Sequence, residues 1–251
     1  MTVTDRLLEA IEREERAVLF TVIEGKGVGS HALVLEGGER RGDGVPEEAL
    51  AQAEELIREH RSRILELGES KVFADVYGPP PRLVIYGAVD TAEALCAAAK
   101  LLGWRTIVAD ARAKFATSER LPSADEIVVE WPEEAFARLQ LDHATAVVVL
   151  THDDKFDVPA LKAALESDAF YVGALGSRRN QERRRERLLE AGVDEDAIAR
   201  IHGPCGLDLG AESQPETALS ILAEALAVRM GRDAGKLTKS EKRIHAEEVA
   251  G

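Results

Sequence analysis

The chain has 251 residues, of which 45% are hydrophobic and 31% charged, and its formal net charge is −14 at pH 7. This length allows one large domain or two smaller ones with buried cores. The negative charge argues against nonspecific nucleic-acid binding, which requires a basic face. No segment approaches the run of about 18 apolar residues that spans a membrane, and MTVTDRLLEAIEREERAV lacks the apolar core of a signal peptide. We therefore expect a cytoplasmic protein that does not contact membranes.

The two cysteines, Cys96 and Cys205, lie far apart in the sequence. They form neither a CxxC motif nor a zinc pattern, and a disulfide framework is not expected in a chain of this type. We expect both thiols to be reduced, and we predict no metal site.

Residues 1–78 have the pattern of a small α+β domain. Hydrophobic periodicity predicts helices at both ends of a strand pair, and Pro46 stands where the first turn of the second helix is expected. The expected elements are a helix over 1–16, strands over 17–25 and 30–42, a helix over 46–68 and a strand over 71–78. The proline run at 79–81 then indicates a stiff boundary.

Residues 82–232 follow a different pattern, in which short apolar strands alternate with helices. The strands are expected in 82–88, 106–112, 126–131, 145–153 and 170–177. Strands that are apolar on both faces predict a doubly wound, mostly parallel α/β sheet of five or six strands. Such a sheet binds ligands at the carboxyl ends of its strands, where the strand order reverses. Residues 233–251 are predicted to be a tail.

The first of these strands ends at Gly87-Ala88, where a dinucleotide-binding domain carries GxGxxG. Here the turn is GAVDTAEAL, and Val89 and Thr91 replace glycines that let the backbone approach a pyrophosphate. Retained and lost dinucleotide affinity are equally compatible with this turn.

Asp110 ends the second strand, 23 positions after Gly87. An acidic residue near this place bonds a ribose hydroxyl in dinucleotide-binding domains. Alternatively, Asp110 caps the loop that follows it. Its neighbour Arg112 is a candidate for binding a phosphate.

Thr151, His152 and Asp153 end the fourth strand, which is expected beside the first. Because this cluster directly follows VVVL, we favour a ligand-binding role over a packing role. A histidine there suits a general acid or base, a ligand contact or a hydrogen-bonding anchor, although lone histidines are more often structural. Lys155 follows as a further candidate, with a solvated lysine as the alternative.

Gly176, Ser177, Arg178 and Arg179 end the fifth strand and open a helix. Free backbone N–H groups and two guanidinium groups at a helix start predict an anion-binding site. The basic run continues with four more arginines, which we expect on a solvated helix face interleaved with Glu182 and Glu186. These arginines are Arg183, Arg184, Arg185 and Arg187.

The last part of this region contains a glycine-rich loop over 203–212 and a helix. Asp208 is the candidate ligand contact in the loop, because so much backbone freedom suits a turn packed close to a ligand. Ser213 and Glu216 fit a capping box, and Leu219, Leu222 and Leu226 are expected to form the core stripe of the helix. Glu224 suits either a salt-bridged surface or a pocket wall.

Several motifs in this order resemble the carboxyl-terminal Rossmann-like domain of the XdhC/CoxI family. They are GAVDTAEALCAAAKLLGW, TIVADARAKFATSERLPSADEIVVEWP, VVVLTHDDKFDVPALKAAL, YVGALGSRRN and GPCGLDLGAESQPETALSILAEALAV. The resemblance covers roughly residues 82–232. It implies an accessory chaperone, for which catalysis in the strict sense is not required, for maturation of a xanthine dehydrogenase or carbon monoxide dehydrogenase type molybdenum hydroxylase.

The cofactor that this resemblance implies is the molybdenum cofactor (molybdopterin), and the implied partner is a subunit of the hydroxylase. Thr151 to Asp153 would line the crevice for the pterin ring, and Gly176 to Arg179 would hold the phosphate tail. Two alternatives stay open, namely an NAD(P)-binding oxidoreductase and a non-catalytic scaffold that has lost ligand transfer. A homodimer is plausible, since the apolar helices near both termini offer a symmetric face.

The amino-terminal half departs from the family pattern. A GSxPRxxG-like loop and a later cysteine are expected there, but the stretch reads GKGVGSHALVLEGGERRGDGVPEEAL. If that cysteine handles cofactor or sulfur in relatives, this chain does not do so in the same way. Cys205 is not an evident substitute, since a buried inert thiol is its expected state.

Overall fold

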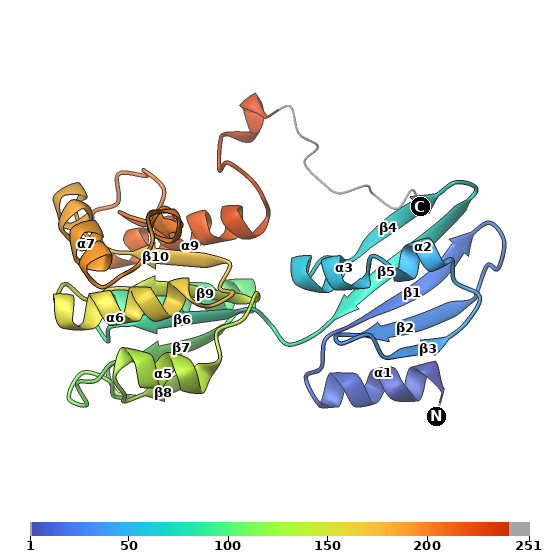
Figure 1. Ribbon diagram of the computed structural model, residues 1–251, viewed down its shortest axis with the longest axis horizontal. Coiled ribbons are helices and arrows are strands. Elements are labelled where there is room, and N and C mark those ends of the chain that lie inside the picture. Colours follow the sequence, from blue (N-terminus) through green and yellow to red (C-terminus); the bar gives the residue numbers. More distant parts are fainter. Residues whose placement is uncertain (1, 241–251) are drawn as a thin grey trace. The chain divides into compact units, whose positions relative to one another are not determined.

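The structure is a computed structural model that describes residues 2–240 (Figure 1). It divides into two compact units at the proline run. One contains the chain up to Pro79 together with the described residues from Lys236, including the 3-10 helix η2 (Leu237–Lys239). The other contains Pro80–Gly235. Of the predicted tail, residues 241–251 lie outside the described residues.

The first unit is an antiparallel sheet covered on both faces. Its strand order is β3-β2-β1-β5-β4. Helix α1 packs on one face, and helices α2 and α3 pack on the other. The elements are α1 (Val3–Glu12), β1 (Ala17–Glu24), β2 (His31–Leu35), β3 (Arg40–Gly42), α2 (Glu47–Leu50), α3 (Ala53–Glu59), β4 (Arg63–Leu67) and β5 (Ser70–Tyr77).

The single helix predicted over 46–68 is wrong. The chain forms two short helices, and His60 ends the second in a left-handed conformation with φ 51°. Arg63–Leu67 then pairs antiparallel with β5. The apolar residues at 64, 65 and 67 are compatible with the periodicity of a helix or of a strand. Pairing with β5 favours the strand.

The second unit is a six-stranded sheet with the order β11-β10-β9-β6-β7-β8. Every neighbouring pair is parallel. The strands are β6 (Arg82–Tyr86), β7 (Arg105–Ala109), β8 (Glu126–Val128), β9 (Thr145–Val149), β10 (Tyr171–Ala174) and β11 (Ile201–His202). The prediction of a doubly wound parallel sheet is confirmed, and the strand order reverses between β6 and β9.

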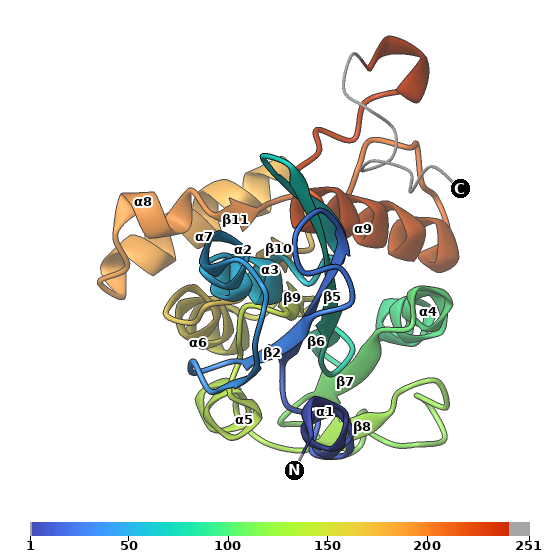
Figure 2. The same cartoon turned by 90° about the vertical axis from the view of Figure 1, so that its right-hand side faces the viewer.

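Helices cover both faces of this sheet, as Figure 2 shows. Helices α4 and α9 bury one face, and α5, α6 and α7 bury the other. The helices are α4 (Asp90–Ala99), the 3-10 helix η1 (Lys100–Leu102), α5 (Pro132–Leu139), α6 (Asp154–Leu165), α7 (Arg178–Glu190), α8 (Glu195–Ile198) and α9 (Gln214–Arg229).

Helix α9 begins with the predicted capping box of Ser213 and Glu216. Leu222 and Leu226 of the predicted stripe pack in the core, but Leu219 is 59% exposed and Ile221 is fully buried in its place. The buried face of α9 contains Ala218 and Ala225, and these small side chains allow α4 to pack closely against it. Within residues 2–240, no helix combines the length and the apolar content needed to cross a membrane.

Candidate functional site

The turn after β6 is shaped by the close approach of β9. Gly87 has φ +116°, and a Cβ atom at this position would lie 2.9 Å from Thr151 Cγ2. A side chain is therefore excluded for both conformational and steric reasons. Packing against Thr151 is sufficient to explain this glycine without a bound pyrophosphate.

Asp110, at the end of β7, is buried and fully hydrogen-bonded by its own chain. Its Oδ2 accepts from the Ala88 N–H at 2.8 Å and from Arg112 Nη2 at 2.7 Å. Its Oδ1 accepts from the backbone N–H and Nε of Arg112, both at 2.9 Å. Burial raises the pKa of Asp110, but the hydrogen bonds from Arg112 and Ala88 outweigh it and lower the pKa overall. The structure thus gives Asp110 the loop-capping contacts that the sequence left as its alternative.

Thr151, after β9, belongs to a buried polar network. Its hydroxyl donates to Asp157 Oδ1, and Asp157 Oδ2 accepts from Arg184 Nη2 at 2.8 Å. The same nitrogen of Arg184 donates to the Leu175 carbonyl at 3.0 Å. The network therefore fastens the end of β9 and the start of α6 to the segment just before Gly176.

The prediction that Arg184 lies on a solvated face is wrong, since this side chain is buried against Asp157. Its neighbours in the basic run are exposed as predicted, but their partners are not Glu182 and Glu186. Arg183 pairs with Asp154 at 3.3 Å, and Arg185 pairs with Glu195. A buried carboxylate 27 positions away supplied the partner for Arg184 that the local sequence does not reveal.

His152, Asp153 and Lys155 lie on the surface at the same edge of the sheet. Asp153 caps α6 by accepting from the Lys155 N–H, and Lys155 Nζ lies 3.1 Å from its Oδ2. These hydrogen bonds with Lys155 lower the pKa of Asp153. Within the described part of the chain, the structure gives the His152 side chain no hydrogen-bond partner.

The turn after β10 is open. Gly176 has φ +137°, and Ser177 caps α7 by accepting from the Asn180 N–H at 3.3 Å. Arg178 and Arg179 follow in the first turn of this 13-residue helix, and both are exposed. No residue between 2 and 240 pairs with either guanidinium group. Positive charge and free N–H groups at a helix start favour an anion there.

The loop after β11 is anchored to α9 by Glu224. Its Oε2 accepts from the Tyr171 hydroxyl at 2.6 Å and from the Gly206 N–H at 2.8 Å. Glu224 is therefore an internal brace between β10, α9 and the loop. Asp208 is exposed in this loop. Cys205 is buried, and burial raises its pKa to about 12, so the thiol stays protonated at neutral pH.

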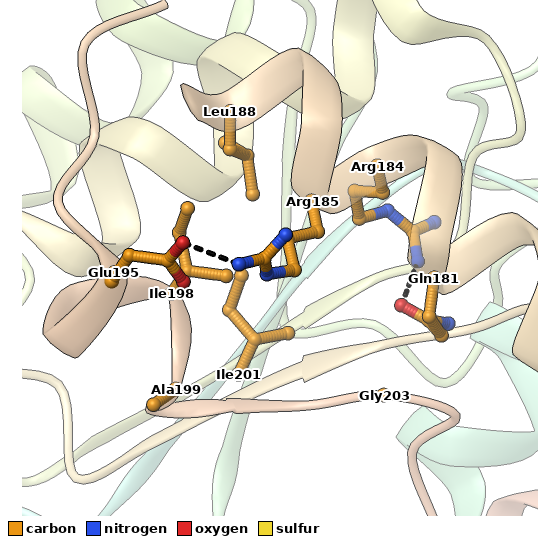
Figure 3. Close-up of a pocket in the computed structure, with 9 residues that line it drawn as sticks. All are labelled: Gln181, Arg184, Arg185, Leu188, Glu195, Ile198, Ala199, Ile201 and Gly203. Atoms are coloured by element: carbon orange, nitrogen blue, oxygen red, sulfur yellow. Dashed lines mark hydrogen bonds and ion pairs between the residues drawn. The ribbon is translucent and has the colours of Figure 1, made fainter. Parts of the chain in front are cut away.

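Sequence reasoning missed a pocket of about 240 Å³ beside α7, α8 and β11 (Figure 3). Its floor is apolar, and Figure 3 shows Arg185 directed at Glu195 and Arg184 at Gln181. The lining residues are Gln181, Arg184, Arg185, Leu188, Glu195, Ile198, Ala199, Ile201 and Gly203. None of the predicted site residues is among them.

A second feature that sequence reasoning missed is an aromatic and cationic cluster around Phe156. The Trp131 ring lies 5.1 Å from the Phe156 ring, measured between centroids. Lys155 Nζ lies 4.7 Å and Arg112 Cζ 5.5 Å from the Phe156 centroid. Trp131 is the last residue of the expected strand 126–131, so an aromatic residue at a strand end was the available signal.

The structure thus joins the predicted site residues into two groups and leaves others separate. Gly87, Ala88, Asp110 and Thr151 form closed contacts within the chain, while Ser177, Arg178 and Arg179 form an open helix start. Within residues 2–240, no hydrogen bond or ion pair links the Asp208 side chain to either group. No cluster of three or more histidine, cysteine or acidic residues suited to a metal ion occurs there either.

Comparison with known proteins gives a family match, several relatives and a similar solved structure. A family model described as the XdhC Rossmann domain matches residues 83–225. The chain is 34% identical over 173 residues to the uncharacterized protein YqeB of Escherichia coli K12, which covers 68% of this chain and 32% of YqeB. It is 31% identical over 160 residues to a protein of Bacillus subtilis 168 described as a probable subunit of xanthine dehydrogenase, which covers 64% and 46% of the two chains.

A third relative is the molybdenum cofactor insertion chaperone PaoD of Escherichia coli K12, with 32% identity over 157 residues that cover 62% of this chain and 43% of PaoD. The chain thus spans less than half the length of these three relatives. Among solved structures, it resembles a xanthine dehydrogenase from Bacillus halodurans with a TM-score of 0.68 and 26% identity, over 90% of this chain and 66% of that one. The chain belongs to the family defined by the XdhC Rossmann domain.

Proposed function

We propose that this chain binds the molybdenum cofactor and acts in the cytoplasm as an accessory chaperone for a molybdenum hydroxylase of the xanthine or carbon monoxide dehydrogenase type. The names of two relatives support this role, since one is a molybdenum cofactor insertion chaperone and the other a probable xanthine dehydrogenase subunit. The cofactor is then a cargo that the protein holds and transfers. No catalytic residue is required for such a role.

The observation that carries the proposal is the open start of α7. Arg178 and Arg179 are exposed and have no partner within residues 2–240, although acidic side chains are abundant in this chain. Holding two adjacent guanidinium groups beside free helix N–H groups is unfavourable without an anion. The phosphate of molybdopterin fits this donor set, and Arg binds phosphate through paired N–H groups.

The pterin ring would bind along the ends of β9 and β10. His152 and Asp153 are exposed there and offer both hydrogen-bond donors and acceptors, which the polar edge of a pterin requires. Thr151 is buried and committed to Asp157, so its part is to position this segment. Gly87 and Ala88 would form the wall on the β6 side, and Lys155 and Asp208 remain candidate contacts at the margins.

The NAD(P)-dependent alternative has less support. A ribose hydroxyl needs a free acceptor on Asp110, but all four hydrogen bonds to this carboxylate come from Ala88 and Arg112. The turn GAVDTA also lacks the glycines for a close approach to pyrophosphate. Fold alone does not assign an oxidoreductase function.

The test is to purify the full chain anaerobically from a molybdenum-replete host and to measure released pterin by mass spectrometry and absorbance. We expect pterin with the wild type and its loss, by at least about tenfold, with the Arg178→Ala, Arg179→Ala variant, since two charge-assisted phosphate contacts are removed. A His152→Ala variant should lose pterin to a smaller extent.

The matched control is Arg183→Ala, Arg187→Ala, which removes the same charge from exposed positions further along α7. This control should retain pterin. Equal loss in both double variants would indicate a general charge effect and refute the anion site. Capture of a hydroxylase subunit by wild-type protein, and weaker capture after pterin is removed, would support the proposed client.

A further inference from the structure

The half-exposed ring of Trp131 lies at the carboxyl edge of the parallel sheet, beside two cations. Trp131 is 48% exposed and is the N-cap residue of α5, after β8 and two further residues. One side of its ring is supported by Phe156, with an interplanar angle of 43°. A large aromatic ring left half in water forgoes much of its burial energy, which favours a ligand over a packing role.

The two cations are Arg112 and Lys155, which lie at the Phe156 ring beside Trp131. An anionic group attached to a ring stacked on Trp131 would lie near them. Arg112 uses Nε and Nη2 on Asp110, which leaves Nη1 without a partner within the described residues. Lys155 is exposed, and its ion pair with Asp153 is a surface contact of low energetic value. Both cations lie over the Phe156 ring that supports Trp131. We call Trp131, Phe156, Arg112 and Lys155 the Trp131 platform.

We propose that the Trp131 platform binds a nucleotide moiety, with its planar base stacked on Trp131 and its phosphate at Arg112 and Lys155. Aromatic stacking is tolerant of base identity, and neighbouring cations supply affinity for the phosphate. The chemistry is common to a free nucleotide and to the nucleotide half of a dinucleotide form of the molybdenum cofactor. The second source rests on the proposed function, whereas the stacking site does not.

The chain offers a direct probe, because it contains two tryptophans. Trp104 is 3% exposed and packs edge to face against Phe170, so emission accessible to acrylamide comes from Trp131. We expect AMP, GMP and CMP to quench this emission and to shield it from acrylamide. Ribose 5-phosphate, which lacks the ring, should do neither.

Variants separate stacking from charge. Trp131→Ala should weaken nucleotide binding about 5- to 100-fold in calorimetric titrations, as expected for loss of one base–aromatic stack. Trp131→Phe, which keeps a ring, should recover most of the affinity. Lys155→Ala should lower both the affinity and its dependence on salt. Leu219→Ala, an exposed apolar truncation on α9, should match the wild type.

Equal binding of ribose 5-phosphate and AMP would overturn the proposed nucleotide site. Unchanged nucleotide affinity in a Trp131→Ala protein with an unchanged unfolding midpoint would do the same.

Pterin content distinguishes failure of the nucleotide site from failure of the proposed function. Pterin bound to wild type and to Trp131→Ala, with no nucleotide quenching, refutes the platform alone. Nucleotide quenching in a protein that never carries pterin supports the platform and refutes the cofactor proposal. Release of an intact pterin dinucleotide that protects Trp131 would identify that source.

Discussion

The turns after β6 and β10 share a glycine conformation but differ in whether the protein itself fills their hydrogen bonds. Each contains a glycine with positive φ between a buried strand and a helix. The first is closed, because Asp110 binds Ala88 and Gly87 packs against Thr151. The second is open, because Arg178 and Arg179 project from the helix start without partners in residues 2–240. The proposed anion site therefore lies at the fifth strand of this sheet and not at the first, where a dinucleotide fingerprint would place it.

A buried arginine holds the open turn after β10 in place. Arg184 lies under it, 5% exposed, and connects the 3% exposed Asp157 with the Leu175 carbonyl. Three exposed arginines further along the same helix, Arg183, Arg185 and Arg187, make surface pairs instead. Helix α7 thus has one arginine that supports the turn and two, Arg178 and Arg179, without a partner in residues 2–240.

The largest effect is expected for Arg184→Ala. Removing it leaves the Asp157 carboxylate buried without its cation, which should lower the free energy of unfolding by about 3–5 kcal/mol. Urea unfolding followed by circular dichroism measures this loss. Arg183→Ala, at an exposed pair on the same helix, should cost no more than about 1 kcal/mol. Similar losses in the two variants would contradict a buried support.

Asp110→Ala should destabilise the closed turn by about 2–3 kcal/mol, because the Ala88 and Arg112 backbone N–H groups lose their acceptor. The same urea titration applies. Asp90→Ala, at an exposed carboxylate of the neighbouring helix, is the control and should be nearly neutral. A neutral Asp110→Ala would mean that the turn is not closed by this residue.

The lowered pKa of Asp110 also makes the free energy of unfolding depend on pH. Its pKa is lower in the folded protein than in the unfolded chain, so its contribution is present above the unfolded value of about 4 and is lost as pH falls through the folded value. The stability difference between wild type and Asp110→Asn should therefore be largest at neutral pH and shrink below about pH 4. A difference that stays constant down to pH 3 would contradict the lowered pKa.

Gly87→Ala should cost about 1–2 kcal/mol, since it forces a side chain into a left-handed conformation against Thr151. Gly210 provides the matched control, with φ +70° and no atom within 4 Å of an added Cβ. Gly210→Ala should cost less, because only the backbone penalty remains. Thermal unfolding of the two variants, compared under the same conditions, measures the steric part.

The smallest effect on folding is expected for Arg178→Ala, Arg179→Ala. Neither side chain has a partner within residues 2–240, so the free energy of unfolding should stay within about 0.5 kcal/mol of the wild type. Urea unfolding without added ligand tests this. Substantial destabilisation would show that the second turn is also closed by the protein itself.

The architecture of the second unit was predictable because five of its parallel strands lie in short apolar runs that alternate with helical segments, whereas the two-residue strand β11 gave no such signal. The strand ends at Asp110, Thr151 and Gly176 located the edge of the sheet where we propose that the ligand binds. Local periodicity failed at residues 63–67, where pairing with β5 decides between helix and strand.

Long-range pairing also limited prediction of the site. The basic run of α7 reads as solvated throughout, and only Asp157, far away in the sequence, identifies Arg184 as buried. Trp131 reads as the end of an apolar strand, and its exposure depends on the short edge strand β8 ending at Val128. Asp110 had the right position and residue type for a ribose contact, but its hydrogen bonds to Arg112 could not be deduced from spacing.

The strand order has a consequence for synthesis of the chain. Strand β6 is made first in its unit, yet it lies in the centre of the sheet between β7 and β9. Its β9 partner follows late, since Arg82 and Thr145 face each other 63 positions apart. Until β9 has left the ribosome, β6 keeps an unpaired apolar edge of the kind that drives aggregation. Chains that stop short of residue 145 should therefore be the species that chaperones must protect.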